Sequence, residues 1–286
     1  MVTIETNKNS IDEVKSISEI FPKIKKERML YTHAKVMTKD ETDELYSYES
    51  AICKIKFKTK INGQIRDGSG TGFFCEINDA NIPFKKALFT NNHILNKKSI
   101  EMNKEVIFEN CKKINKIIIT KNRKIFENEK LEYICIELFD ADKINKFFRI
   151  DETVFKNINN LINTEIFILQ YPHGELSHDS GRILDIKNNL IMDSVTTEDG
   201  SSGAPLIKRY NINLIIGMHF GSHKDYNLAI PFDIIIKDIK DQLSIKIEYM
   251  NKINLISEKK DIKDPLSKTI EYRNKINLIY EKKDKY

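Results

Sequence analysis

The sequence predicts an all-β protein, and the evidence is a change in the pattern of apolar residues along the chain. Between about residues 47 and 240, short runs of apolar or alternating β-forming residues recur between turn signals. About eleven such runs occur, with few convincing helical patterns between them, and this spacing is typical of a β-barrel or β-sandwich. The runs are AICKIKF, GTGFFCEI, KALFTNN, KIIITK, EYICIELF, EIFILQYP, GRILDIK, NLIMDSV, APLIKRY, LIIGMHF and NLAIPF.

The segments on either side of this region have a different character. Residues 1–46 form an N-terminal extension in which residues 10–30 are predicted to be helical, because a capping-box pattern is followed by apolar residues at helical spacing. The β-rich domain, 47–240, is expected to end in a helix within IIIKDIKDQLS. The tail, 241–286, contains the sequence of Ile247–Asp261 again at Ile270–Asp284, a period of 23 residues. We expect these two copies to be β-like strands, and two copies alone do not build a solenoid.

Composition limits the classes of function. The chain has 286 residues, is 40% hydrophobic and 31% charged, and so is typical of a soluble globular protein. The formal net charge of +5 comes from interleaved basic and acidic residues, which does not indicate a nucleic-acid partner. No apolar run is long enough to span a membrane, and the polar N-terminus does not resemble a secretory signal. We therefore expect a cytoplasmic protein with no membrane or nucleic-acid partner.

The four cysteines fit this expectation. Their spacings match no zinc motif, so no metal site is predicted. Cys53, Cys75 and Cys135 each lie in an apolar, strand-like run, which predicts buried free thiols.

Three segments of the β-rich region carry residues suited to catalysis, and their order is informative. A strand-like run leads to His93 in ALFTNNHIL, a second begins beside Glu132 in LEYICIEL, and a small-residue loop, TTEDGSSGAP, is centred on Ser202. Acyl transfer needs a nucleophile, a base, an acid that orients the base, and donors for the oxyanion. The glycines on either side of Ser202 allow a tight turn in which the amides of Gly200 and Ser202 point to one place.

The order of base, acid and nucleophile separates the known families of serine hydrolase. His, then acid, then Ser is the order of the chymotrypsin family, whereas α/β-hydrolases and subtilisins have other orders. The loop is also Gly-x-Ser-Gly rather than the pentapeptide of a nucleophile elbow. The glycine-rich segment Gly68–Gly72 is not a phosphate-binding loop, because it contains no lysine and precedes a strand rather than a helix.

With these motifs in place, residues 47–240 resemble a trypsin-like serine peptidase, from the divergent branch that lacks disulfides. GSGTGFFCEI followed by KALFTNNHIL resembles the strand pair that leads to the catalytic histidine, and TTEDGSSGAPLI resembles the nucleophile loop. EIFILQYPHGE resembles the first strand of the second barrel, and LIIGMHFGS followed by NLAIPF resembles the substrate-binding strand and its partner. The resemblance implies two perpendicular six-stranded antiparallel β-barrels with the active site in the cleft between them.

The resemblance also implies roles for individual residues. His93 is the general base, Ser202 the nucleophile, and the amides of Gly200 and Ser202 form the oxyanion hole. Glu132 stands where the family normally has aspartate, and we expect it to orient His93, with Asp140 and Asp142 as alternatives. Ser201 stands where secreted trypsins have the aspartate that pairs with a new N-terminus, so that activation switch is not expected here.

Specificity is predicted from two further positions. Thr197 and His219 correspond by resemblance to residues that line the pocket for the substrate side chain before the scissile bond (P1). A hydroxyl beside an imidazole suits a carboxylate or a carboxamide, which predicts cleavage after Glu or Gln.

The sequence thus predicts a serine endopeptidase that needs no cofactor or metal and acts on protein or peptide substrates. Its oligomeric state is not predicted. Two other functions remain open: a pseudoprotease that serves as a protein-binding scaffold, with catalysis impaired through Glu132, and an esterase that uses the same residues.

Overall fold

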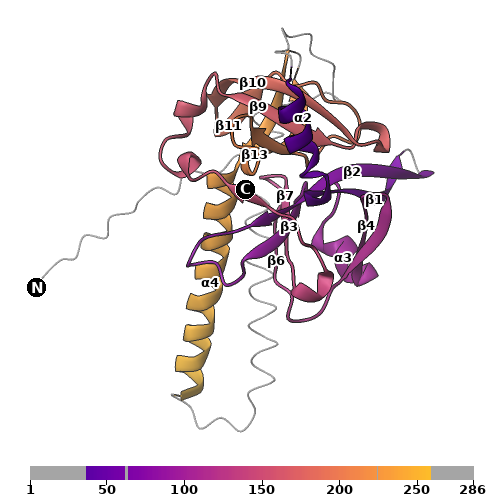
Figure 1. Ribbon diagram of the computed structural model, residues 1–286. Helices are drawn as coiled ribbons and strands as arrows, with labels where there is room; N and C mark the ends of the chain where they lie inside the picture. Colours follow the sequence, from indigo (N-terminus) through magenta and orange to yellow (C-terminus); the bar gives the residue numbers. More distant parts are fainter. Residues whose placement is uncertain (1–36, 62–63, 224, 259–286) are drawn as a thin grey trace, which may run out of the picture. The chain divides into compact units, whose positions relative to one another are not determined.

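The computed structural model describes residues 37–61, 64–223 and 225–258 (Figure 1). The chain divides into two compact units, Met1–Ile239 and Lys240–Tyr286. The first unit contains every strand in the described residues, and these strands form two groups.

The first group of strands follows the path β5-β4-β1-β2-β3-β7-β6, antiparallel throughout. Strands β3 and β7 lie inside this path, and nearly all of their residues are buried. The core of this group is a cluster of buried side chains that includes Phe74, Phe108 and Ile136. The strands are β1 (Ile52–Ile61), β2 (Gln64–Glu76), β3 (Lys86–Thr90), β4 (Glu105–Asn110), β5 (Lys113–Ile118), β6 (Ile125–Asn128) and β7 (Tyr133–Glu137).

The second group closes into a six-stranded antiparallel barrel. Its path is β12-β9-β10-β11-β14-β13, and β13 pairs back onto β12, which leaves no free edge. The strands are β9 (Glu165–Gln170), β10 (Ser177–Lys187), β11 (Leu190–Asp193), β12 (Pro205–Lys208), β13 (Leu214–His223) and β14 (Tyr226–Pro231).

A short strand and an aromatic cluster join the two groups. Strand β8 (Phe148–Ile150) pairs in parallel with β2 of the first group and with β13 of the second. The ring of Phe73 lies 5.8 Å from that of Phe89 and 5.9 Å from that of Phe232, and Phe148 packs edge-on against Phe73. All four side chains are fully buried, so the cluster forms a shared core for β2, β3, β8 and the start of the last helix.

Helices are few in the described residues. Helix α2 begins with a capping box between Thr38 and Glu41, and Glu41 receives two hydrogen bonds of 2.8 Å from Arg209, which follows β12. This bidentate pair holds the pKa of Glu41 down at about 2 and fixes α2 to the second barrel. The helices are α2 (Lys39–Tyr46), α3 (Lys97–Asn103) and α4 (Phe232–Glu258), and the 3-10 turns are η1 (Glu49–Ala51), η2 (Asp140–Asp142), η3 (Glu152–Phe155), η4 (Ile158–Leu161) and η5 (Pro172–Gly174).

The all-β fold and the strands expected from apolar runs are confirmed, as is the helix after Pro231. Strands β4, β6 and β8 were not predicted, because their sequences EVIFEN, IFEN and FRI are short or mix polar with apolar residues. The β-like tail is wrong for residues 247–258, which belong to α4. Its apolar residues are close enough together to suit either a strand or a helix. The expected helix at 10–30 and the second repeat copy lie outside the described residues.

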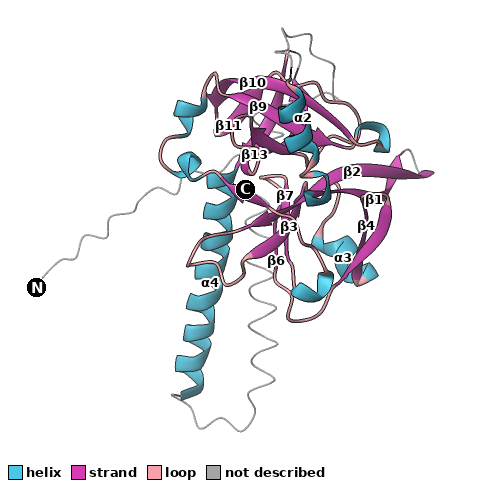
Figure 2. Ribbon diagram, viewed as in Figure 1, coloured by secondary structure: helices cyan, strands magenta, loops and turns pink. Residues whose placement is uncertain are grey.

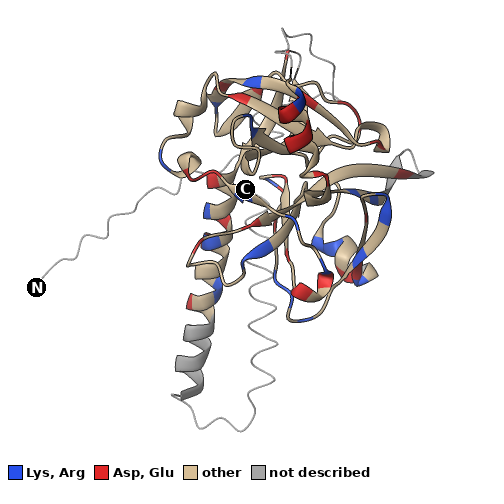
Figure 3. Cartoon of the chain, in the orientation of Figure 1, with Lys and Arg blue, Asp and Glu red and all other residues tan. Residues whose placement is uncertain are grey.

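The distribution of charged and apolar residues in the structure agrees with the composition of the chain. Basic and acidic residues are interspersed over the strands of both groups (Figure 3). None of the helices in the described part of the chain combines the length and apolar character that crossing a bilayer requires. Cys53, Cys75 and Cys135 are free and buried as predicted, and burial raises the pKa of each thiol.

The aromatic cluster makes a prediction about stability. Phe232→Ala removes a fully buried ring and should lower the free energy of unfolding by about 3–5 kcal/mol. Phe155→Ala is the matched control, because that ring is 47% exposed and its loss should cost less than about 1 kcal/mol. Chemical denaturation measures both, and equal losses would contradict a shared core at Phe232.

Candidate active site

His93 lies just beyond a buried strand that pairs on both sides. Strand β3 pairs with β2 and with β7, and Ala87–Thr90 are fully buried. The chain leaves the sheet at Asn91, and the side chain of His93 is 42% exposed. The central strand β3, paired on both sides, therefore places the imidazole of His93 at the surface.

Glu132 meets His93 because the end of β3 lies beside the start of β7. Thr90 is paired with Ile134, two residues after Glu132. Oε2 of Glu132 lies 3.0 Å from Nδ1 of the His93 ring and also accepts a hydrogen bond of 3.3 Å from the His93 amide. The carboxylate therefore holds both the ring and the backbone of the histidine.

The backbone of Glu132 is in the left-handed region, with φ at 53°. For a residue with a side chain, this conformation costs on the order of 1 kcal/mol or more and needs support. The carbonyl oxygen of Glu132 accepts hydrogen bonds of 2.9 Å from Nδ2 of Asn91 and 3.3 Å from the amide of Asn92. The two asparagines before His93 thus hold the acid in place, a role that the sequence did not reveal.

The alternative acids, Asp140 and Asp142, are engaged elsewhere. Asp142 forms a bidentate pair with Arg123, at 2.8 and 3.0 Å, and Asp140 lies 3.1 Å from Nζ of Lys86. The structure thus brings Glu132 to His93, while each aspartate pairs with a basic side chain.

The loop around Ser202 is shaped by two glycines that no other residue could replace without strain. Gly200 has φ at 107°, and a Cβ there would lie 2.4 Å from the carbonyl oxygen of Tyr171. Gly203 has φ at 86°, and a Cβ there would lie 2.0 Å from the carbonyl oxygen of Thr71. Both positions combine a left-handed backbone with a close approach to another strand or turn, which only glycine allows.

Thr71, a fully buried residue of β2, holds this loop against the first group of strands. Its amide donates to the carbonyl oxygen of Ser202 at 2.9 Å, and its hydroxyl donates to that of Gly200 at 2.8 Å. The same hydroxyl accepts from the amide of Tyr171 at 3.0 Å. The carbonyl oxygen of Thr71 accepts from the Thr90 hydroxyl at 2.8 Å, three residues before His93. Thr71 therefore connects the Ser202 loop to the strand that carries His93.

The peptide between Asp199 and Gly200 has a fixed orientation. The carbonyl oxygen of Asp199 accepts a hydrogen bond of 2.7 Å from the amide of His173 in η5. The described residues contain no cis peptide, so the N–H of Gly200 points away from the His173 amide. A contact of 3.0 Å between His173 Nε2 and Glu198 Oε2 also joins the same two loops through their side chains.

Ser201 is fully buried and stabilises the turn from inside. Its hydroxyl accepts a hydrogen bond of 3.0 Å from the Glu198 amide, and its own amide donates to the Glu198 carbonyl oxygen at 3.0 Å. The turn is thus closed by local hydrogen bonds at the position where secreted trypsins have an aspartate.

Comparison with solved structures identifies the fold. The crystal structure of the inactive form of Rv3671c protease matches with a TM-score of 0.51 at 13% identity, over 74% of this chain and 98% of that one. The fold is that of the trypsin-like serine peptidases. The serine endoprotease from Yersinia pestis (71% of this chain, 66% of that one) and Deg5 (71% and 95%) match with TM-scores of 0.49 at 15% identity. No family model and no curated protein matches the sequence.

In this trypsin-like fold, Thr197 and His219 lie close to the Ser202 loop and are almost completely buried. The amide of Gly203 donates to the His219 carbonyl oxygen at 2.8 Å, and the His219 amide donates to that of Ala204, also at 2.8 Å. The hydroxyl of Thr197 lies 3.0 Å from Oδ1 of Asn227. The two residues predicted to recognise the substrate side chain thus lie beside the Ser202 loop.

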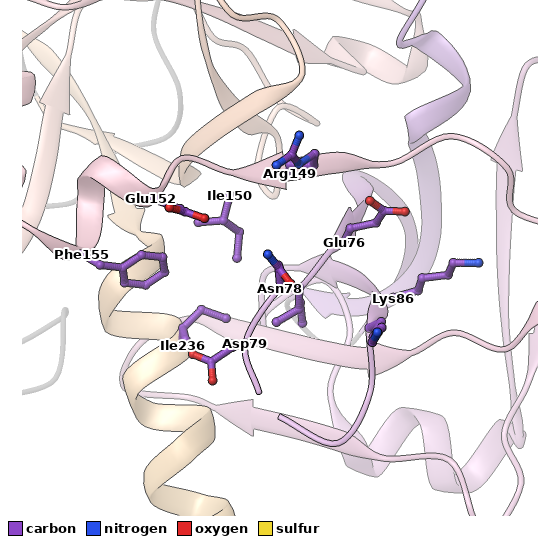
Figure 4. A pocket seen from close by; sticks show the side chains of 11 residues that line it. Glu76, Asn78, Asp79, Lys86, Arg149, Ile150, Glu152, Phe155 and Ile236 are labelled. Atoms are coloured by element: carbon purple, nitrogen blue, oxygen red, sulfur yellow. The ribbon is translucent and has the colours of Figure 1, made fainter. Parts of the chain in front are cut away.

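A separate cavity of about 380 Å³ lies away from these residues (Figure 4). It is lined by the ends of β2 and β3 together with β8, η3 and α4, and its charged side chains include Glu76, Lys86, Arg149 and Glu152. None of the candidate catalytic residues lines it. Among the described residues, no group of three or more His, Cys, Asp or Glu side chains is placed to hold a metal ion.

Proposed function

We propose that the protein is a serine endopeptidase in which His93, Glu132 and Ser202 form the catalytic triad. The observation that carries the proposal is the contact of 3.0 Å between Glu132 Oε2 and His93 Nδ1, in a trypsin-like fold whose Ser202 loop is hydrogen-bonded to Thr71 of the neighbouring strand β2. These three residues would supply the base, the acid and the nucleophile that an activated serine requires.

The first half of the reaction follows from this arrangement. Accepting a hydrogen bond from Nδ1–H, the Glu132 carboxylate favours the tautomer of His93 whose Nε2 carries a lone pair. Nε2 takes the proton of the Ser202 hydroxyl as Oγ bonds to the carbonyl carbon of the substrate, and Glu132 stabilises the imidazolium that forms. The carbonyl oxygen becomes an oxyanion, to which the amides of Gly200 and Ser202 donate.

The second half regenerates the enzyme. The imidazolium gives its proton to the leaving amine, the C–N bond breaks, and an acyl ester of Ser202 remains. Water then attacks the ester with His93 again as base, and the acid product leaves as the proton returns to Oγ. Support for the oxyanion hole comes from the fixed Asp199–Gly200 peptide, whose carbonyl oxygen is held by the His173 amide.

The substrate is a protein or peptide, and the side chain before the scissile bond is Glu or Gln. Thr197 and His219 line its pocket: an imidazole N–H of His219 donates to the carbonyl or carboxylate oxygen, and the Thr197 hydroxyl itself donates to Oδ1 of Asn227. Their position beside Gly203 and Ala204 supports this assignment.

Labelling with a fluorophosphonate probe tests the nucleophile. The wild-type protein should be labelled, because the probe reacts with activated serines, and Ser202→Ala and His93→Ala should each lower the labelling rate at least roughly 1,000-fold. Ser177→Ala, a serine on β10 outside the site, should label like the wild type. A folded wild-type protein that is not labelled would contradict the proposal and favour a scaffold role.

Substitution of the acid tests the triad assignment separately. Glu132→Gln keeps the shape of the side chain but presents a neutral amide to Nδ1, so kcat should fall at least about 100-fold. Asp140→Asn is the control and should leave kcat unchanged, because Asp140 pairs with Lys86. Equal kcat for wild type and Glu132→Gln in peptide hydrolysis would show that Glu132 does not orient the base.

A further inference from the structure

A buried acid lies behind the residues proposed to recognise the substrate, and the strand register brings it there. Asp193 ends β11 and is paired with Asn227 on β14. His219 on β13 is paired with Ala229, two residues after Asn227. Because paired residues and residues two apart on a strand share a face, the side chains of Asp193, Asn227 and His219 lie on one face of three neighbouring strands.

Asp193 is unusual because its carboxyl group is completely buried. Both Asp193 and His219 are fully buried. Oδ1 of Asp193 accepts a hydrogen bond of 3.1 Å from the Val195 amide, whereas Oδ2 has no hydrogen-bond partner among the described residues. A buried carboxylate is costly unless an opposite charge or donors compensate it, so a nearby cation has a large effect on it.

The charged groups that face Asp193 come from two strands. Burial raises its pKa to about 6, and the attraction of His219 on β13 opposes this rise, as do the Val195 amide and Asn227. Asp179 on β10 adds a smaller effect in the raising direction. Asp193 therefore changes its charge near pH 6, beside the imidazole of His219.

This cluster is part of the proposed P1 pocket. His219 exchanges backbone hydrogen bonds with Gly203 and Ala204, directly after the nucleophile. Thr197 reaches the same cluster through its hydroxyl contact with Asn227. The acid therefore lies next to the imidazole that would meet the substrate side chain.

Resting on the proposed function, we propose that Asp193 balances the charge of His219 and makes the P1 pocket select glutamine over glutamate. With Asp193 ionised, its pair with His219 carries no net positive charge, and a carboxamide adds none. A glutamate side chain would instead place a second carboxylate against a single imidazole in a buried site, which costs free energy.

The same charge balance predicts a change with pH. As the pH falls through about 6, Asp193 gains a proton and the pocket loses its negative charge. A glutamate substrate stays largely ionised down to about pH 5.5, because its ordinary pKa is about 4.3. The preference for glutamine should therefore weaken at acidic pH and be strongest near pH 8.

The experiment compares kcat/KM for two peptides that differ only in Gln or Glu before the scissile bond, from pH 5.5 to 8. Their ratio is independent of the triad, because protonation of His93 slows both peptides equally. We expect Gln to be favoured at least about tenfold at pH 8, equivalent to about 1.4 kcal/mol, and the ratio to fall as the pH drops below 6. A ratio that favours Glu at pH 8, or one that does not change with pH, would overturn the proposal.

Two variants of the full chain isolate the residue. Asp193→Asn keeps the oxygen that accepts from Val195 but removes the charge, so the Gln:Glu ratio at pH 8 should fall about tenfold and lose its pH dependence. Asp185→Asn, an exposed position on β10, should keep the wild-type ratio. An unchanged ratio in Asp193→Asn would overturn the role of Asp193.

Fluorophosphonate labelling of wild type and of Asp193→Asn separates this proposal from the one on which it rests. Failure of Ser202 labelling in the folded wild-type protein would refute the peptidase itself. Labelling by both proteins with wild-type cleavage mainly after Arg or Phe would refute the pocket assignment and this inference with it, while leaving the triad intact.

Discussion

The hydrogen bonds of Thr71 are the constraint on which the rest of the site depends. A proposed nucleophile and its base that come from different groups of strands must be held together by something other than their own contact. Thr71 does this from a fully buried position on β2, because its amide, hydroxyl and carbonyl oxygen each take part. Its hydroxyl and its amide donate to the carbonyl oxygens of Gly200 and Ser202, respectively. Its own carbonyl oxygen accepts from the hydroxyl of Thr90, on the strand that ends near His93. The two halves of the proposed triad are thereby built into one hydrogen-bonded unit.

Several sequence features that look like separate motifs serve this one unit. Gly203 is a glycine because the Thr71 carbonyl oxygen lies where a Cβ would be, and Gly200 is a glycine because Tyr171 approaches it in the same way. The asparagines before His93 hold the strained backbone of Glu132, so the acid reaches the imidazole without help from its own strand. Ser201 and His173 keep the loop in shape by local contacts, which explains how the turn is held without an aspartate that pairs with a new N-terminus.

The sequence predicted what depends on local pattern and on motif order. The strands with long apolar runs were predicted, and the motifs around His93, Glu132 and Ser202 singled out these residues, whose order then excluded other hydrolase families. The sequence did not reveal residues whose roles depend on contacts across the fold. Thr71, for example, has the pattern of an ordinary strand residue, and its role comes from its hydrogen bonds to the Ser202 loop. In the sequence, Asp193 is only the end of an apolar run. Its role depends on His219, which the pairing of β13 with β14 places on the same face. The tail was predicted to be β-like because its apolar residues suit either structure, and residues 247–258 are helical.

The most direct test of this account is the rate at which Ser202 reacts with a fluorophosphonate when the Thr71 hydroxyl is removed. Thr71→Val keeps the shape and loses both hydroxyl hydrogen bonds, whereas Thr71→Ser keeps the hydroxyl and loses only a methyl group. Thermal unfolding of each variant identifies any that fails to fold at the assay temperature. The account predicts a rate at least about tenfold lower for Thr71→Val, equivalent to about 1.4 kcal/mol, and a rate for Thr71→Ser close to that of the wild type. A folded Thr71→Val variant that reacts as fast as the wild type would show that the nucleophile loop does not depend on this residue.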